Sequence, residues 1–407
     1  MTTCRLCSSK NLGDAIDLGS LPIAHRMRHR RDETEQRYPM RNVLCRDCGL
    51  MQIAEPIDPE ELYRDFNFCF SGWKPQPHIA SELNMISRTA PGKSMLEIGS
   101  NDGLFLLEAR KSGFGPLLGI EPNPLTAKQA RSGGLTIVNE MLSPALAARI
   151  ESEHGRFDTI VVRQVLEHLL DIPGFFACVD LLLSSQGVLF VDVPDVEQGM
   201  RSGDATMLWE EHVNSFTTPV LQSALARFGF TVAESERYNF SGGTIAIAAR
   251  RGAAEKLSLD LDEQLAVAGG FGQRVEGYQR KLKSILARAR KAGFGVVLYG
   301  AGNRACTLTN SAGLQELIDY SVDDQIERQG LFMPGTGIEV RPAAALSQEG
   351  KRFLCILAVN NENEAKVSAK VRELAHVPVQ IFTALSPADI HAELDRISSV
   401  LDREGTP

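Results

Sequence analysis

Two C-x-x-C pairs near the start constrain the fold of this chain more than any other feature of its sequence. They are Cys4/Cys7 and Cys45/Cys48, with residues 8–44 between them. A two-residue spacer turns tightly enough for both thiolates to reach one ion, and four thiolates satisfy tetrahedral Zn²⁺. Four protein ligands leave no position for water, so we expect a structural zinc site. An iron–sulfur or redox role for these cysteines is the alternative.

The composition is that of a globular, multidomain chain. Its 407 residues exceed one ordinary domain, and 43% hydrophobic with 23% charged residues excludes a disordered chain. The net charge of -8, without a basic stripe, argues against nucleic-acid or membrane partners. The sequence shows no spanning apolar run, no secretory signal and no dimerisation signature. We therefore expect a cytoplasmic monomer.

The order of strand and helix patterns predicts four regions. We expect a zinc-binding module over residues 1–72, an α/β domain over 73–250, a helical connector over 251–293 and a second α/β domain over 294–407. Short apolar strands alternate with helical segments in both α/β regions, as in doubly wound folds. The first α/β domain is expected to contain strands 94–98, 117–120, 135–138, 159–162 and 187–193, and an antiparallel strand 244–249. The second is expected to contain strands 296–299, 317–322, 353–359 and 379–382.

The connector carries apolar residues at helical spacing. They recur every three or four residues, which predicts one packed helix face rather than a cofactor site. The stripe consists of Phe271, Val275, Tyr278, Leu282 and Ile285.

The first glycine-rich turn joins a strand to a helix start over residues 97–103. Glycine there allows close backbone approach of a ligand, and the helix N-terminus can stabilise a carboxylate. Glu121, at the end of the next strand, is placed to accept both ribose hydroxyls of a nucleoside. The pattern E-x-G-x-x-x-G resembles motif I of S-adenosylmethionine-dependent methyltransferases, and a tight turn without a ligand is the alternative. The candidate cofactor contacts are Glu97, Gly99, Asn101, Asp102, Gly103 and Glu121, with Gln164 after the fourth strand.

A second glycine-rich turn, Gly300-Ala301-Gly302-Asn303-Arg304-Ala305, follows the strand that ends at Tyr299. It fits G-x-G-x-x-A, and Asp323 and Asp324 end the next strand. Taken alone, this pattern suggests NAD and an oxidoreductase. A turn with a purely structural role is the alternative.

Three histidines outside these motifs are expected to have no catalytic role. His25 and His29 lie singly among arginines between the cysteine pairs, so we expect them to be solvated. His168 follows the fourth strand of the first α/β domain and is interpreted as a structural helix-start residue rather than a catalyst.

Together these features resemble a known family, the sugar C-methyltransferases of deoxysugar pathways. The resemblance implies an α/β fold with a small zinc-binding module, a class I methyltransferase Rossmann-like domain and a second Rossmann-like α/β domain. It covers nearly the whole chain. The matching segments are 18–22, 38–39, 97–103, 119–122, 211–212, 242–243, 299–301, 319–320, 329–336 and 341–342.

The resemblance also implies a reaction. S-adenosyl-L-methionine would donate a methyl group to carbon of a nucleotide-linked keto-deoxysugar, which is the small-molecule partner. A carbon beside a ketone is acidic enough for a positioned base to remove its proton. His212 is the candidate base, and Glu211 is expected to orient it or raise its basicity. Ordinary packing of this Glu–His pair is the alternative.

Several substitutions relative to the family fall at expected substrate contacts. Trp209 stands where the family usually has tyrosine, Asn214 stands where it has serine, and Arg304 matches a lysine. We expect Trp209 and Asn214 to contact the substrate, and Tyr299 and Arg304 to lie near its phosphates, because arginine binds phosphate in a bidentate manner. A solvated Arg304 is the alternative.

These substitutions leave other functions open. An O- or N-methyltransferase acting on a related sugar or natural product would need the same cofactor site. An NAD-dependent sugar oxidoreductase would use the Gly300 turn. A zinc-anchored interaction protein with degenerate pockets would bind no small molecule tightly.

Overall fold

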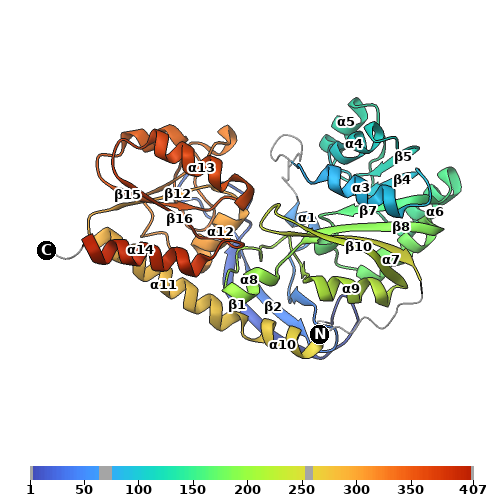
Figure 1. Ribbon diagram of the computed structural model, residues 1–407, viewed down its shortest axis with the longest axis horizontal. Coiled ribbons are helices and arrows are strands. Elements are labelled where there is room, and N and C mark those ends of the chain that lie inside the picture. The colour runs from blue at the N-terminus through green and yellow to red at the C-terminus, as the bar shows by residue number, and fades with distance from the viewer. Residues whose placement is uncertain (1–2, 64–75, 253–259, 405–407) are drawn as a thin grey trace.

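The computed structural model describes residues 3–63, 76–252 and 260–404. Within these stretches the strands form three sheets. Figure 1 shows a central lobe and a C-terminal lobe side by side, with the N-terminal strands β1 and β2 between and below them. No helix in this part of the chain is long and apolar enough to cross a membrane.

The N-terminal module is a small antiparallel sheet that includes a piece of the central lobe. Its order is β1-β2-β3-β9, where β9 follows β3 in space but not in sequence. Met51 pairs with Ser215, and Gln52 pairs with Asn214. The elements are β1 (Leu12–Pro22), β2 (Arg37–Cys45), β3 (Met51–Ile53), β9 (Asn214–Ser215) and the short helix α1 (Pro59–Leu62).

The central lobe is built on a seven-stranded sheet of order β10-β11-β8-β7-β4-β5-β6. Strand β11 is antiparallel to both of its neighbours, and the other pairs are parallel, so the predicted antiparallel last strand is confirmed. β10 was not expected from the sequence. The strands are β4 (Met95–Ile98), β5 (Leu117–Ile120), β6 (Thr136–Val138), β7 (Phe157–Arg163), β8 (Leu183–Pro194), β10 (Phe230–Tyr238) and β11 (Thr244–Arg251).

Helices cover both faces of this sheet, as its buried apolar strands require. One face packs against α3 (Ile79–Thr89), α4 (Leu104–Lys111) and α5 (Pro124–Ser132). The other face packs against α6 (Pro144–His154), α7 (Ile172–Leu182) and α9 (Thr218–Arg227). The 3-10 turn η1 (Leu166–His168) follows β7, and α8 (Glu197–Ser202) follows β8.

The C-terminal lobe is a parallel five-stranded sheet of order β14-β13-β12-β15-β16. Four of its strands were predicted, although β13 and β15 are shorter than expected, and the two-residue β14 was missed. The strands are β12 (Gly295–Tyr299), β13 (Tyr320–Val322), β14 (Val340–Arg341), β15 (Phe353–Leu357) and β16 (Val379–Thr383). The helical elements are α12 (Asn303–Ser311), η2 (Ile326–Arg328), η3 (Ala343–Gln348), α13 (Asn361–Leu374) and α14 (Ile390–Glu404).

Helices α10 (Leu261–Gly269) and α11 (Phe271–Lys291) connect the two lobes. All five residues of the predicted stripe are buried, which confirms that it is a packing face. Phe271 and Val275 pack with residues of β1, α8 and the loop after α8. Tyr278, Leu282 and Ile285 enter the core of the C-terminal lobe, where the Tyr278 hydroxyl donates to the Ala384 carbonyl at 2.7 Å. One helix face therefore belongs to two cores.

The N-terminal module also contacts the C-terminal lobe directly. The main chain of Arg28 pairs with that of Phe332 through hydrogen bonds of 2.9 and 2.8 Å. Gly335 donates its amide to Glu35 at 2.9 Å, and Arg37 donates to the Gly335 carbonyl at 3.0 Å. The segment 329–336 thus docks on the N-terminal module.

The three boundaries between the four predicted regions stay predictions. The first, between residues 72 and 73, lies outside the described residues. Strand β9, which comes from the middle of the chain, moreover completes the sheet of the N-terminal module.

We expect Leu282→Ala to lower the free energy of unfolding by about 2–5 kcal/mol, because it empties a fully buried position in the shared face of α11. Chemical denaturation measures this loss. Arg280→Ala, on the exposed face of the same helix, is the matched control. A Leu282→Ala protein as stable as the control would contradict the packing assigned to α11.

Candidate functional site

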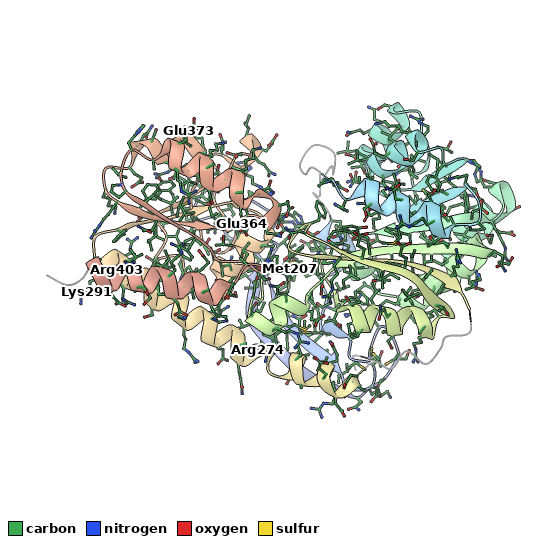
Figure 2. The ribbon with its side chains drawn as sticks, viewed as in Figure 1. Met207, Arg274, Lys291, Glu364, Glu373 and Arg403 are labelled. Atoms are coloured by element: carbon green, nitrogen blue, oxygen red, sulfur yellow. The ribbon has the colours of Figure 1, made fainter. Side chains whose placement is uncertain are left out.

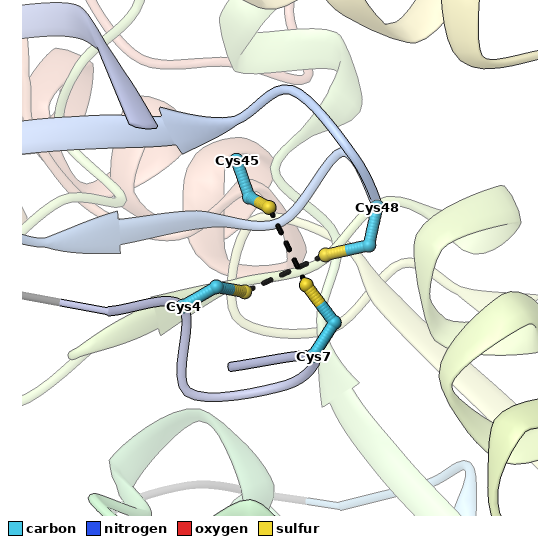
Figure 3. Close-up of side chains that lie close together, drawn as sticks. All are labelled: Cys4, Cys7, Cys45 and Cys48. Atoms are coloured by element: carbon cyan, nitrogen blue, oxygen red, sulfur yellow. Dashed lines mark hydrogen bonds between the residues drawn. The ribbon is translucent and has the colours of Figure 1, made fainter. Parts of the chain in front are cut away.

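The four cysteines of the two C-x-x-C pairs converge on one point (Figure 3). The Cys4 and Cys48 sulfurs are 3.5 Å apart, as are those of Cys7 and Cys45, and all four lie within 4.8 Å of one another. Four thiolates about 2.3 Å from one Zn²⁺ have sulfurs about 3.8 Å apart, so the cluster fits this ion. Hydrogen bonds within the cluster lower the pKa of Cys45 and raise those of Cys4 and Cys48, so the sulfurs share protons that a bound cation would displace. These cysteines form the structural zinc site.

The first zinc knuckle is hydrogen-bonded to the segment that carries His212. Arg5, between Cys4 and Cys7, donates from its guanidinium to the Val213 carbonyl at 3.1 Å and to the Ile53 carbonyl at 2.8 Å. Its amide donates to the Gln52 side chain at 2.9 Å. The zinc site therefore supports the pairing of β3 with β9.

A pocket opens at the carboxyl ends of β4 and β7. The turn after β4 is left-handed at Gly99 (φ +78°) and Asn101 (φ +47°). A Cβ at Gly99 would lie 2.5 Å from the Val165 side chain, so glycine is required there. The lining residues are Gln76, Glu97, Gly99, Ser100, Asn101, Asp102, Leu104, Phe105, Arg163, Gln164 and Phe240.

Glu97 gives this pocket its chemical character. Its side chain is 2% exposed, and one carboxyl oxygen has no hydrogen-bond partner. Burial raises its pKa to about 8. A cationic ligand such as the aminoacyl sulfonium of S-adenosylmethionine would satisfy this oxygen, so the residues present fit that cofactor.

Two predicted cofactor contacts lie behind the turn rather than among the lining residues. The carboxylate of Glu121 accepts the amides of Asn101 and Asn123, each at 2.8 Å. Gly103, at φ +81°, begins α4 where a Cβ would lie 2.4 Å from Leu135. Glu121 and Gly103 therefore shape the turn, and their contact with a cofactor stays a prediction.

A buried ionic cluster that the sequence did not reveal borders the pocket. The Arg163 guanidinium lies 3.0 Å from the Glu82 carboxylate and 3.8 Å from Asp192, and it stacks over the Phe105 ring. Burial raises the pKa of Glu82 and lowers that of His78 beside it to about 4. The available signal was the position of Arg163, a charged residue that ends strand β7 after an apolar run.

His212 is buried, with 5% of its surface exposed. Its Nδ1 lies 3.1 Å from the Met207 carbonyl, and a carbonyl only accepts, so Nδ1 carries the hydrogen and Nε2 the lone pair. The Trp209 ring packs against the imidazole with 3.6 Å between ring centroids. Trp209 thus contacts the candidate base itself.

Glu211 directs its carboxylate to His25. The two side chains meet at 3.1 Å, and the expected orientation of His212 by Glu211 stays a prediction. The prediction that His25 is solvated was wrong, since its side chain is 16% exposed. The apolar neighbours Ile23 and Ala24 are buried and draw this segment inward.

His168 links the pocket to His212. Its Nδ1 lies 2.7 Å from the Glu211 carbonyl, and its ring meets the His212 ring edge-on at 5.3 Å. Asn214 donates to the Leu169 carbonyl at 2.7 Å and to the Leu166 carbonyl at 3.3 Å, which fixes the turn η1 against β9. His168 and Asn214 thus hold the turn η1 against the segment that carries His212.

Two further predicted substrate contacts are engaged within the C-terminal lobe and at its border. The Tyr299 hydroxyl donates to Asp324 at 3.1 Å inside the lobe. Arg304 is 6% exposed, which excludes a solvated side chain, and it binds Asp204 at 3.0 Å and the Ser386 carbonyl at 2.7 Å. Figure 2 shows Met207, in the same loop as Asp204, at the junction of the lobes. Arg304 therefore joins the lobes.

In the second glycine-rich turn, the acidic residue Asp323 binds the main chain of the turn itself. Asp323 accepts the Ala301 amide at 2.8 Å and pairs with Arg328 at 3.1 Å. Gly300 has φ +107°, and a Cβ there would lie 2.7 Å from the Ala358 carbonyl. These contacts favour the structural interpretation of this turn.

The strand order of the central lobe and its glycine turn define a class I S-adenosylmethionine-dependent methyltransferase. Three family models match consecutive parts of the chain: a zinc binding domain at residues 4–63, a methyltransferase domain at 76–235 and a C-methyltransferase C-terminal domain at 241–384. In sequence order the chain thus carries a zinc binding domain, a methyltransferase domain and a C-methyltransferase C-terminal domain, and it is a methyltransferase.

Two curated proteins and one solved structure are among those similar to this chain. The chain is 24% identical to C-methyltransferase NovU of Streptomyces niveus over 83% of this chain and 84% of that protein. It is 28% identical to a ubiquinone biosynthesis O-methyltransferase of Pasteurella multocida over 33% of this chain and 64% of that protein. A solved methyltransferase from Mesorhizobium loti superposes with a TM-score of 0.34 at 16% identity, over 42% of this chain and 96% of that one.

We expect Cys7→Ser to loosen β3 and β9 while leaving the cofactor pocket intact. Loss of a ligand weakens zinc binding, and Arg5 then loses its fixed position beside Val213. Hydrogen–deuterium exchange should quicken in peptides covering 51–53 and 212–216 and stay unchanged at 95–98. Cys178→Ser, outside the cluster, is the control, and equal exchange in both variants would separate the zinc site from the His212 segment.

Glu97→Gln should reduce the pH dependence of stability and weaken cofactor binding. A carboxyl whose pKa is about 8 when folded holds a proton that the unfolded chain loses near its ordinary pKa. Its contribution to stability therefore falls as pH rises from about 4.5 to about 8, by at most about 1.4 kcal/mol per unit. Denaturation at pH 5.5 and 8 should show a smaller difference in the variant, and calorimetry should show weaker binding of S-adenosylmethionine. An unchanged slope would refute the burial argument.

Proposed function

We propose that this protein methylates carbon next to the ketone of a nucleotide-linked keto-deoxysugar, with His212 as the base. One observation carries the proposal: the hydrogen bond of Nδ1 to Met207 leaves Nε2 as the proton-accepting atom of a buried histidine. The sugar substrate follows from the sequence resemblance, and C-methylation is consistent with the NovU relative.

The cofactor is held by the residues around the first glycine turn. S-adenosylmethionine, when bound, supplies an electrophilic methyl group on a sulfonium. Glu97, Gly99, Asn101, Asp102 and Gln164 line its pocket. In this proposal Glu121 contributes through the turn that it fixes.

The remaining chemistry belongs to the chain. His212 Nε2 removes a proton beside the ketone, which leaves an enolate carbon as the nucleophile. The face of Trp209 against the imidazole favours the imidazolium that forms, as aromatic faces do for cations. The pair of Glu211 with His25 holds the segment that carries His212 against the N-terminal module. Burial keeps bulk water from the enolate.

The carbon acceptor is supported by the match to the C-methyltransferase C-terminal domain and by the NovU relative. The base alone does not select it, because a neutral histidine can remove a proton from carbon or from a hydroxyl. An O- or N-methyltransferase on a related acceptor is the second candidate, and the Pasteurella multocida relative is an O-methyltransferase by name.

We expect His212→Asn to lower turnover by about 10²–10⁴-fold and to leave S-adenosylmethionine affinity unchanged. With a nucleotide-linked ketosugar in D₂O and no methyl donor, the wild type should exchange the proton beside the ketone, and the variant should not. Mass spectrometry measures this exchange without requiring methyl transfer.

The exposed His154→Asn serves as a control that retains exchange. Full turnover in His212→Asn would remove this residue from catalysis. A product whose methyl group sits on oxygen or nitrogen by NMR would establish the second candidate instead.

A further inference from the structure

Besides the cysteines, three groups of histidines and carboxylates in the described part of the chain bring ligand atoms within 4.8 Å of one another. Two of them already have partners for their charge. Arg163 pairs with the carboxylates of the group at 78, 82 and 192. In the group at 25, 210 and 211, Glu210 accepts the Ala24 amide at 2.7 Å and Glu211 meets His25. The third group is Glu167, His168 and His212.

Glu167 is the unexplained member of this third group. Its side chain is 1% exposed, and neither carboxyl oxygen has a hydrogen-bond partner. The Nε2 atom of His168 lies 3.7 Å from one carboxyl oxygen of Glu167. A buried carboxylate without partners is costly, and a cation bound beside it would offset that cost.

Both histidines present the nitrogen that a metal needs. His168 Nδ1 donates to the Glu211 carbonyl at 2.7 Å, and His212 Nδ1 donates to the Met207 carbonyl at 3.1 Å. Each Nε2 therefore carries a lone pair. Metal-binding histidines in proteins are commonly held in this way, with the other ring N–H on a main-chain carbonyl.

We propose that Glu167, His168 and His212 form a second divalent-metal site and that an ion there inhibits methyl transfer. Two imidazoles and one carboxylate suit Zn²⁺, Co²⁺ or Ni²⁺ and leave a coordination position for water. Ligand atoms about 2.1 Å from one ion lie about 3–4 Å apart. Here His168 Nε2 lies 3.7 Å from a Glu167 oxygen, and ligand atoms of all three residues lie within 4.8 Å of one another. A metal-bound His212 nitrogen has no lone pair for a proton, so binding and proton abstraction exclude each other. The inhibitory part rests on the proposed function, whereas the binding part does not.

The binding part is tested by counting ions. The protein with its structural zinc in place is dialysed against Co²⁺, and cobalt per chain is measured together with the visible spectrum. We expect one additional ion without a thiolate-to-cobalt charge-transfer band. Glu167→Gln and His168→Asn should each weaken this ion more than tenfold, and the exposed His154→Asn should retain it.

No additional ion in the wild type, or its retention in both variants, would overturn the proposal. Thermal midpoints of the variants close to that of the wild type establish that a lost ion is not lost fold, and the near-isosteric Glu167→Gln is the decisive variant. A charge-transfer band would place the cobalt at the cysteines instead.

The inhibitory part is tested with Zn²⁺ in the methyl-transfer assay. Turnover of the wild type should fall as Zn²⁺ is added, and Glu167→Gln should need at least tenfold more Zn²⁺ for the same loss. An additional ion that binds without lowering turnover would overturn this part. An enzyme inactive on ketosugars even without added metal would count against the proposed function and leave the ion count valid.

Discussion

The pairing of β3 with β9 is the contact on which the site depends. Only two residues of each strand pair, yet this pairing connects the zinc module to β9, which follows His212 in the sequence. Arg5 reinforces this pairing from inside the first C-x-x-C turn. The zinc ion therefore supports a loop of another lobe, although it takes no part in chemistry. A small core that metal binding stabilises can in this way fix a catalytic side chain.

Much of this architecture could be predicted because it depends on local sequence. Most strands of the two larger sheets, the stripe on α11 and the four cysteines follow from periodicity and spacing, and the structure contains them. The short strand β14 was missed because two residues carry no periodic signal. β10 was missed because its burial alternates weakly at the edge of the sheet.

The site was predicted less completely, because its contacts join distant segments. His25 and Glu211 meet across the N-terminal module and the central lobe, and only the tertiary fold brings them together. Arg304 was assigned to phosphate from its residue type, whereas its partners Asp204 and Ser386 come from two other segments. The residue types alone identified the candidate side chains, whereas their contact partners depend on the tertiary fold.

The two lobes share helix α11 rather than merely touching each other. Phe271 and Val275 pack in the core formed with β1 and α8, and Tyr278, Leu282 and Ile285 pack in the core of the C-terminal lobe. Unfolding of either core would therefore expose part of helix α11. Domains that share a structural element tend to melt together instead of in sequence. This chain should accordingly unfold as one cooperative unit in calorimetry. Replacing its C-terminal lobe by that of a relative would require replacing helix α11 as well.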